Sequence, residues 1–526
     1  MVGESHRGFL TLATIADSTV AVLFWYCRLM SRPNILFVVS DQERQRDWLP
    51  EGVNLPSRQR LIDNGLEFTN HYTHTSPCSP SRATLFTGQY LAEHGVSENS
   101  SFPTNTELST NALTLGKLLR EQGYTSAFKG KWHLEGRPDP DMEAYGYSDW
   151  EGNDQMFWGL AGSGTEYDEP IARSAADWIR SHGNDDDPWF LTVGLVNPHD
   201  IMWYPIDQPW YREREPDAYE LAQSILSTRD WGRADNFPPF VHEIDRWFTD
   251  LPANFDDDLH TKPEVHRSFM TGWMNRYPFM GIERDDPDIW LRQLDYYVKL
   301  HELSDQNLGL ILSAMDDIGG WDDTIVIFTA DHGDQCGSHG LRSKGPWNYQ
   351  ETMRVPLYIV APGITKSATT THALTSAVDL ARGIAEFAGV NTADIPTLQG
   401  SSMAPLFEDP TSKIRDYVLF SQEWAWFQGV ERSRYASSGI FDGRYKYCRY
   451  YGIGGGYDAA GAKLSGDEML FGRGAAFDEH DHELYDLQED PHELVNLALD
   501  RGRRHDLRAR FGELRAVEHE VYANGF

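Results

Sequence analysis

The chain has 526 residues, more than one ordinary core of ~100–200 residues, which predicts a large domain joined to a smaller one. Hydrophobic residues make up 40% of the sequence, and its 17 Trp, 24 Tyr and 25 Phe provide ample core material, which excludes an intrinsically disordered chain. The formal net charge of −34 argues against nucleic acid and anionic membranes as partners, because both would be repelled.

Residues 1–31 are predicted to be an N-terminal extension, disordered or upstream of a natural start at Met30. The segment 8–27 is moderately apolar, but Asp17 interrupts it and no convincing small-residue cleavage site follows. A spanning helix needs ~20 apolar residues without a buried acid, so no stable membrane insertion is expected. We expect a cytoplasmic protein, the alternative being a periplasmic or secreted one if this segment is a degraded signal.

Buried strands alternate with helices from residue 32 onward. Short apolar runs rich in β-branched residues are typical of parallel strands covered on both faces, and amphipathic stretches lie between them. The predicted strands are 34–40, 66–72, 124–129, 189–196 and 324–330, and the predicted helices include 56–64, 78–88, 113–122 and 289–315. This order predicts an α/β fold with a large, mostly parallel sheet sandwiched by helices.

The chain divides into two predicted units. Residues 32–410 form the catalytic domain, with an irregular insertion near the site at about 200–285 that is rich in Trp, Tyr, Pro and Asp. Residues 411–526 form a smaller C-terminal α+β subdomain and tail, because short alternating runs there indicate an antiparallel sheet.

Polar side chains follow two of the buried strands at their carboxyl ends. Asp41 and Gln42 come after one strand, and Asp331 and His332 come after another. Open α/β sheets place ligand sites at this edge, and four such donors suit one divalent ion: calcium, magnesium or manganese. Either pair alone is more simply explained as a helix cap. Their common position favours a metal site, and the neutral Gln and His admit manganese.

Cys78 begins one of the predicted helices. The four cysteines, at 27, 78, 336 and 448, form no CxxC pair, which excludes a zinc ribbon, and they are too few for a disulfide framework. Arg82 lies four residues after Cys78 on the same helix face, and a helix N-terminus with an arginine fork suits an oxyanion. A buried, unreactive cysteine is the simpler alternative.

The segment CSPSRATLFTGQ resembles the sulfatase signature Cys-x-Pro-x-Arg, which is long and specific. NILFVVSDQ, GKWHLEG, NPH, TIVIFTADHG followed by SHGLRSKG, and ELYDLQEDPHELVNL occur in the same family's order, over about residues 32–500. On these motifs the chain is identified as a member of the type I sulfatase family, within the alkaline-phosphatase-like superfamily.

The resemblance implies that a formylglycine-generating enzyme oxidises Cys78 to formylglycine during maturation. The hydrated aldehyde would attack the sulfur of a small anionic sulfate ester, and its second hydroxyl would then let sulfate leave. The implied metal ligands are Asp41, Gln42, modified Cys78, Asp331 and His332. The family more often has Asp where Gln42 stands and often Asn where His332 stands. Calcium is the expected ion, but this departure puts the preference for it in doubt and makes manganese the alternative.

The remaining implied roles belong to cations and imidazoles. Arg82 stabilises the ionised diol, Lys131 and His133 bind sulfate and take a proton, and His199 and Lys344 face the leaving-group oxygen. Each of these residues alone is more simply a surface or core residue, and only their joint occurrence in family order favours the roles. Together with the metal they would overcome the chain's acidic field locally.

Other functions remain open at this stage. Phosphonate monoester hydrolases and phosphodiesterases share the Asp-Gln and Asp-His metal set, and Asn99 resembles a substrate-binding residue of that branch. That branch typically lacks the Lys-Trp-His of GKWH, so an arylsulfatase-like activity is preferred, with choline sulfatase as a further alternative. A non-catalytic protein on this fold would lack a nucleophile or a metal set.

The aromatic residues of the insertion could stack on a leaving group or pack in the core: Trp203, Tyr204, Trp210, Trp231 and Trp273. A homo-oligomer is an open alternative.

Overall fold

The computed structural model describes residues 32–526 apart from 101–106, 207, 228–242, 277–283, 424–433, 454–473, 475 and 523–526. The expectation for residues 1–31 and the suggestion for Trp231 lie outside the described residues. Within the described part, no helix combines the length and apolar character needed to cross a bilayer.

A seven-stranded sheet forms the centre of the larger unit, in the order β4-β5-β1-β6-β7-β2-β8. β4, β5, β1 and β6 run parallel, β7 runs antiparallel to both of its neighbours, and β8 pairs parallel with β2. The strands are β1 (Asn34–Asp41), β2 (Leu66–Phe68), β4 (Thr125–Gly130), β5 (Trp189–Pro198), β6 (Thr324–Ala330), β7 (Leu357–Val360) and β8 (Thr369–Thr371). The predicted mostly parallel sheet is therefore confirmed.

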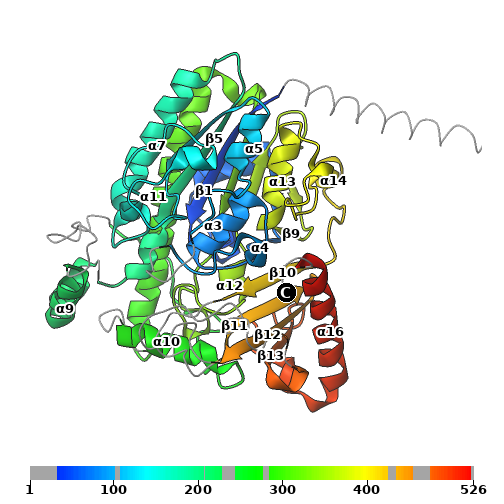
Figure 1. Cartoon of the computed structure of the whole chain (residues 1–526). Coiled ribbons are helices and arrows are strands. Elements are labelled where there is room, and N and C mark those ends of the chain that lie inside the picture. The colour runs from blue at the N-terminus through cyan, green and yellow to red at the C-terminus, as the bar shows by residue number, and fades with distance from the viewer. Residues whose placement is uncertain are drawn as a thin grey trace, which may run out of the picture.

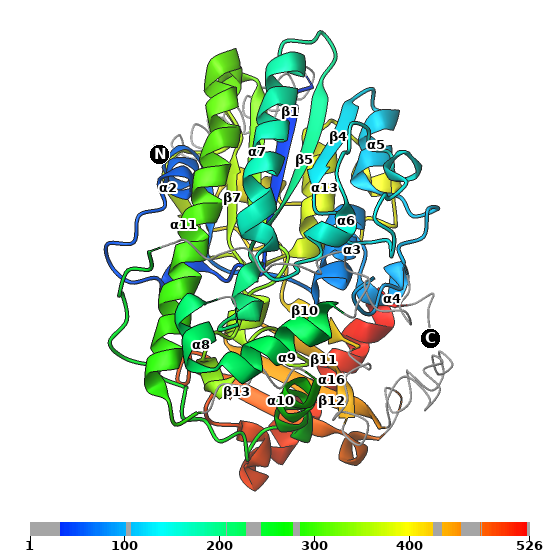
Figure 2. The ribbon, with the colours of Figure 1, turned by 90° about the vertical axis from the view of Figure 1, so that its left-hand side faces the viewer.

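Helices cover both faces of this sheet (Figures 1 and 2). Successive side chains of β1 point to opposite faces, so Ile35 and Phe37 join one core cluster while Leu36 and Val38 join the other. The first face is covered by α3 (Cys78–Thr87), α5 (Leu115–Glu121) and α13 (Ala377–Phe387), and the second by α2 (Pro56–Asn64), α7 (Ser163–His182) and α11 (Pro287–Ile318). Burial on both faces explains why the strands read as continuous apolar runs.

The C-terminal unit is a four-stranded antiparallel sheet in the order β10-β11-β12-β13. Its elements are β10 (Val418–Gln422), β11 (Arg434–Phe441), β12 (Tyr445–Ile453), β13 (Asp481–Asp486) and α16 (Arg504–Val521). Leu507 and Leu514 of α16 pack against Leu419 and Tyr447 of the sheet. The predicted α+β architecture of this region is confirmed.

The segment 200–285 was expected to be irregular, and that expectation is wrong for its described residues. It contains α8 (Pro209–Arg214), α9 (Pro216–Ser227) and α10 (Glu264–Arg276). The sequence was misread because Pro209 and Pro216 stand at helix starts, where proline is favoured, rather than acting as breakers. The shorter elements are α4 (Leu91–His94), α6 (Asp154–Phe157), α12 (Gln350–Met353), α14 (Ala404–Glu408), β3 (His71–Tyr72) and β9 (Thr375–Ser376).

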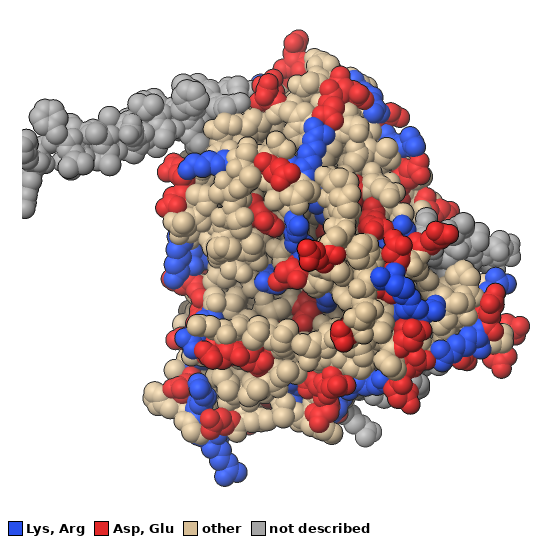
Figure 3. Space-filling model, turned by 180° about the vertical axis from the view of Figure 1, so that it is seen from behind, with Lys and Arg blue, Asp and Glu red and all other residues tan. Residues whose placement is uncertain are grey.

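The surface does not form a single acidic field on the side seen from behind. Figure 3 shows Lys and Arg side chains interspersed with Asp and Glu over this face. The described surface includes exposed ion pairs, such as Arg60 with Asp316 and Arg173 with Glu169. Such pairs contribute little to stability and mainly keep the surface soluble.

Candidate active site

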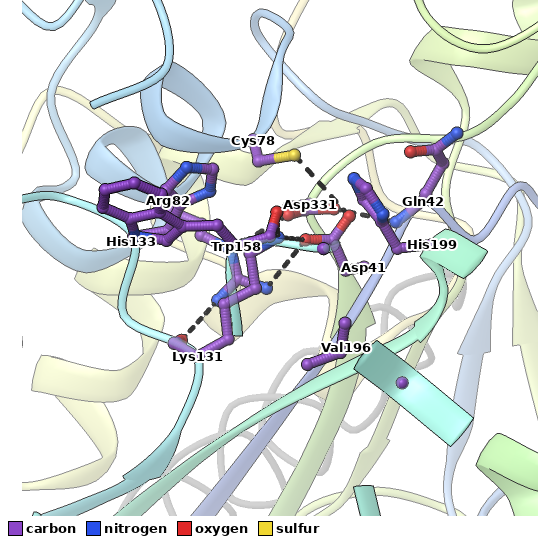
Figure 4. A network of polar contacts seen from close by, with 12 residues as sticks. Asp41, Gln42, Cys78, Arg82, Lys131, His133, Trp158, Val196, His199 and Asp331 are labelled. Carbon is purple, nitrogen blue, oxygen red and sulfur yellow. Dashed lines mark hydrogen bonds and ion pairs between the residues drawn. The ribbon is translucent and has the colours of Figure 1, made fainter. Parts of the chain in front are cut away.

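The carboxyl ends of β1 and β6 meet the first turn of α3. β1 and β6 pair in parallel with Ser40 opposite Ala330, so the next residues, Asp41 and Asp331, lie side by side. One potential metal-ligand atom from each of Asp41, Cys78, Asp331 and His332 lies within 4.8 Å of the others, and all four side chains are buried. Figure 4 shows the Cys78 thiol directed at the two carboxylates.

Cys78 is the first residue of α3 and is fully buried. Its Sγ lies 3.6 Å from Asp41 Oδ1 and 3.2 Å from His332 Nε2. Burial, reinforced by Asp41, raises the pKa of the thiol to about 11. The backbone N–H of Ser79 donates to Asn99 Oδ1 at 3.0 Å, which places Asn99 beside the start of the helix.

Two cationic side chains, Arg82 and Lys131, contact the carboxylates of Asp41 and Asp331. Arg82, one helical turn after Cys78, donates from Nε to Asp331 Oδ2 at 3.0 Å and lies 3.5 Å from Asp41 Oδ2. Lys131 Nζ lies 2.5 Å from Asp41 Oδ2, and the Lys131 carbonyl accepts from Arg82 Nη1 at 2.8 Å. Burial alone would raise the pKa of Asp41, but the cations Lys131 and Arg82 hold it well below its ordinary value.

Lys344 approaches the same site from the loop after β6. Its Nζ lies 3.2 Å from His199 Nε2 and donates to Gln42 Oε1. The Gln42 carboxamide is held on its other side by Asp334, whose Oδ2 accepts from Nε2 at 2.5 Å. In Figure 4 this carboxamide points away from Asp41 and Asp331. Gln42 therefore lies next to the four clustered ligand groups, but its oxygen is directed at Lys344.

Two imidazoles border the site. The His133 ring stacks on Trp158 with centroids 5.6 Å apart and planes at 26° (Figure 4). Neither ring nitrogen of His133 has a hydrogen-bond partner among the described residues. Burial and the nearby Lys131 lower its pKa well below the ordinary value, and burial with Lys344 does the same for the pKa of His199. Both rings are thus neutral and able to accept a proton.

All eleven residues singled out in the sequence lie in or beside this one site. Ten are buried, and Asn99 is partly exposed. Sequence reasoning missed Asp334, although it stands three residues after Asp331, and it missed Asp154, which accepts from the backbone N–H groups of Trp132 and His133. Nothing local in the sequence marks Asp154, because the two backbone groups that it holds lie 22 and 21 residues away.

Comparison with known proteins agrees with this arrangement. A profile of the sulfatase family matches residues 33–390, and one described as N-sulphoglucosamine sulphohydrolase, C-terminal, matches residues 337–460. The chain is 25% identical over 516 residues to N-acetylglucosamine-6-O-sulfatase of Bacteroides thetaiotaomicron, covering 89% of this chain and 82% of that protein. It is 27% identical over 522 residues to the multifunctional alkaline phosphatase superfamily protein PehA of Trinickia caryophylli, covering 90% and 92%.

A solved structure shows the same fold. The phosphonate monoester hydrolase of Agrobacterium radiobacter superposes with a TM-score of 0.65 at 22% identity, covering 93% of this chain and 96% of the other. The sulfatase profile spans well over half of the sequence and includes every strand end that lines the site. This chain therefore belongs to the sulfatase family, whose members are sulfuric ester hydrolases.

Proposed function

We propose that the protein hydrolyses an arylsulfatase-like sulfate ester with a formylglycine nucleophile made from Cys78 and with one bound divalent ion. The observation that carries the proposal is the position of Cys78 Sγ, 3.6 Å from Asp41 Oδ1 and surrounded by cations and metal-ligating groups. The overall reaction consumes water: the sulfate ester yields an alcohol or phenol and hydrogen sulfate. Formylglycine would supply a hydroxyl nucleophile that can also eject the bound sulfate.

The residues present fit a divalent ion. His332 Nδ1 lies 3.0 Å from the Gly333 carbonyl, which favours the proton on Nδ1 and leaves the Nε2 lone pair facing Asp41 and Cys78. Asp41 and Asp331 add two carboxylates to the same point. The ion would act as a Lewis acid that lowers the pKa of a coordinated hydroxyl. Calcium is our first choice, because carboxylate oxygens are ligands that it prefers. Manganese is the alternative, because an imidazole ligand suits manganese better.

The cationic side chains of Arg82 and Lys131 are placed to stabilise negative charge in the site. Arg82 and Lys131 neutralise the two carboxylates, so an anionic ester can approach despite the net charge of −34. His133 has two ring nitrogens without partners in the described part of the chain, which suits contact with sulfate oxygens and acceptance of a proton.

Lys344 and His199 lie 3.2 Å apart and would face the oxygen of the departing alcohol. An alkoxide or phenoxide is a poor leaving group in water, and a positioned ammonium stabilises the charge that develops on it. Because the His199 ring is neutral, it would relay a proton to this oxygen from the Lys344 ammonium rather than supply one itself. This role predicts that Lys344 matters most for substrates whose alcohol has a high pKa.

Mass spectrometry tests the nucleophile directly. Trypsin cleaves after Arg60 and Arg82, so residues 61–82 are released as one peptide with Cys78 as its single cysteine. Conversion of the thiol to an aldehyde lowers the peptide mass by ~18 Da relative to the unmodified cysteine. Enzyme co-produced with a formylglycine-generating enzyme should carry the lighter peptide and hydrolyse an aryl sulfate, while C78A should do neither. Turnover by fully unconverted enzyme would contradict the proposal.

Hydrolysis of phosphonate monoesters or phosphodiesters is the alternative, and Asn99 is the observation that favours it. Its side chain is bonded to the Ser79 backbone next to the nucleophile, as a residue contacting a substrate oxygen would be. Kinetics on an aryl sulfate, choline sulfate, a sulfated sugar and a phenyl phosphonate ester decide between the two. We expect the highest kcat/KM on a sulfate ester, and faster phosphonate turnover would replace our first choice.

A further inference from the structure

Asp154 lies behind the Lys131-Trp132-His133 turn and is fully buried. Its Oδ1 accepts from the Trp132 backbone N–H at 2.9 Å, and its Oδ2 accepts from the His133 backbone N–H at 2.9 Å. The indole N–H of Trp158 also donates to Oδ2, at 3.2 Å. No ion pair to this carboxylate is found within the described ranges. A buried carboxylate held by three N–H donors fixes geometry rather than balancing a charge.

Trp158, which donates to Asp154, also contacts the side chains of His133 and Lys131. Its ring stacks on the His133 imidazole, and its backbone carbonyl accepts from Lys131 Nζ at 3.1 Å. Figure 4 shows the indole and the imidazole side by side next to Lys131. Asp154 and Trp158 together thus contact the backbone N–H groups of Trp132 and His133 and the side chains of His133 and Lys131, in the sulfate-binding half of the proposed site.

The backbone of His133 explains why such a brace is required. His133 has φ of 58°, a left-handed conformation that non-glycine residues adopt at a cost of roughly 1–3 kcal/mol. Gly130, the last residue of β4, also has a positive φ of 83°, so the backbone leaves the extended conformation there. Without the Asp154 carboxylate, this turn would relax and the His133 ring would leave the position next to the Cys78 helix.

We propose that Asp154 and Trp158 are positioning residues that hold Lys131 and His133 in the geometry that binds the sulfate group. The inference rests on the proposed function, because it assigns the sulfate-binding half of that site. It differs from a purely structural role in one respect: affinity for the sulfate group, and not only folding, depends on these two side chains.

The test compares D154N, W158A and W158F with a matched control, D295N. Asp295 is also buried and accepts two backbone N–H groups, from Trp247 at 2.8 Å and Phe248 at 3.1 Å, on a different part of the chain. Unlike Asp154, it also pairs with Arg246 at 3.5 Å. For each variant, kcat, KM, the inhibition constant of inorganic sulfate, the thermal midpoint and the aldehyde content of peptide 61–82 are measured. Rates are expressed per modified enzyme, so that incomplete maturation does not lower them.

We expect D154N and W158A to lower kcat/KM about 10- to 100-fold, because displacing a catalytic group by ~1 Å costs a factor of this size. Both should weaken inhibition by inorganic sulfate, whereas W158F, which keeps a stacking ring, should stay within about threefold of the wild type. D295N should lose stability while its kcat and sulfate inhibition are unchanged. If D154N does not fold, the contrast between W158A and W158F still tests the proposal.

Unchanged sulfate inhibition in both D154N and W158A would overturn the inference. Equal losses of kcat/KM in D154N and D295N, after correction for the amounts of folded and modified enzyme, would also overturn the inference. A wild type that turns over no sulfate ester contradicts the proposed function instead. In that case the variants are assayed on the ester that the wild type does hydrolyse, and unchanged kcat/KM on it would overturn the positioning role separately.

Discussion

Arg82 donates from Nε to Asp331 Oδ2 at 3.0 Å, in a place where neither side chain is exposed to water. This contact links α3, which begins at Cys78, to the end of β6. Breaking a buried ion pair by removing one partner leaves the other charge uncompensated, which typically costs 3–5 kcal/mol, as an order of magnitude. Arg82 is thus placed to affect stability and chemistry together.

The first prediction concerns this pair. R82M should lower the free energy of unfolding by ~3 kcal/mol in metal-free buffer, because Asp331 loses its cationic partner. Added divalent ion should recover part of the loss, since the ion neutralises the same carboxylates. Urea unfolding with and without metal measures both effects. The exposed pair of Arg60 and Asp316 gives the control, R60M, which should change stability by less than ~1 kcal/mol.

A second prediction concerns the contact between Gly159 and His199. Gly159 has φ of +96°, and a Cβ added there would lie 2.2 Å from His199 Cε1. G159A should therefore push the imidazole out of place and reduce kcat/KM ~100-fold, most strongly for esters of weakly acidic alcohols. G95A is the control, because Gly95 has φ of +69° with nothing within 4 Å of the added Cβ. Equal activity losses in both variants would point to backbone strain alone.

The third prediction is a pH dependence of stability due to Glu98. Burial raises the pKa of this carboxyl from 4.5 to about 8, although the Asn99 N–H and Lys344 oppose the shift. The unfolded chain releases the proton near pH 4.5, and the folded chain keeps it until about pH 8. Stability should therefore fall as pH rises through this window, by up to roughly 5 kcal/mol.

The variant E98Q isolates this effect. Glutamine keeps the size of the side chain and removes the titration, so the unfolding free energy of E98Q should exceed that of the wild type increasingly between pH 5 and 8. Chemical denaturation of both proteins at four pH values measures the difference. A constant difference over this range would show that Glu98 has an ordinary pKa in the folded protein.

The fourth prediction concerns metal removal. Asp41 and Asp331 are brought together with Cys78 and His332 in a buried cluster, and an ion bound only by the folded state raises its stability. A chelator should lower the thermal midpoint and abolish turnover, and ~1,000 times the dissociation constant of the right ion should restore about 4 kcal/mol. Titration with calcium and manganese identifies the preferred ion. D41N should show no chelator effect on the midpoint.

Most of the fold could be predicted from the sequence. The runs in β1 and β6 are apolar and β-branched because both faces are covered, and this pattern predicts buried parallel strands without further information. Asp41 and Asp331 could be placed at one sheet edge for the same reason, since parallel strands end together. The helices at Pro209 and Pro216 were missed because proline is favoured both at the first position of a helix and in turns.

By itself, the sequence determined the architecture, the strand ends that carry the proposed metal ligands and Cys78 as the proposed nucleophile position, because strand periodicity and the Cys78 motif are local in the chain. The tertiary structure alone decided which groups touch. Gln42 is directed at Lys344, 302 residues away, and His133 rests on Trp158 and Asp154. Such contacts depend on how strand register and helix packing bring distant segments together. No local pattern of residues specifies which side chains then meet.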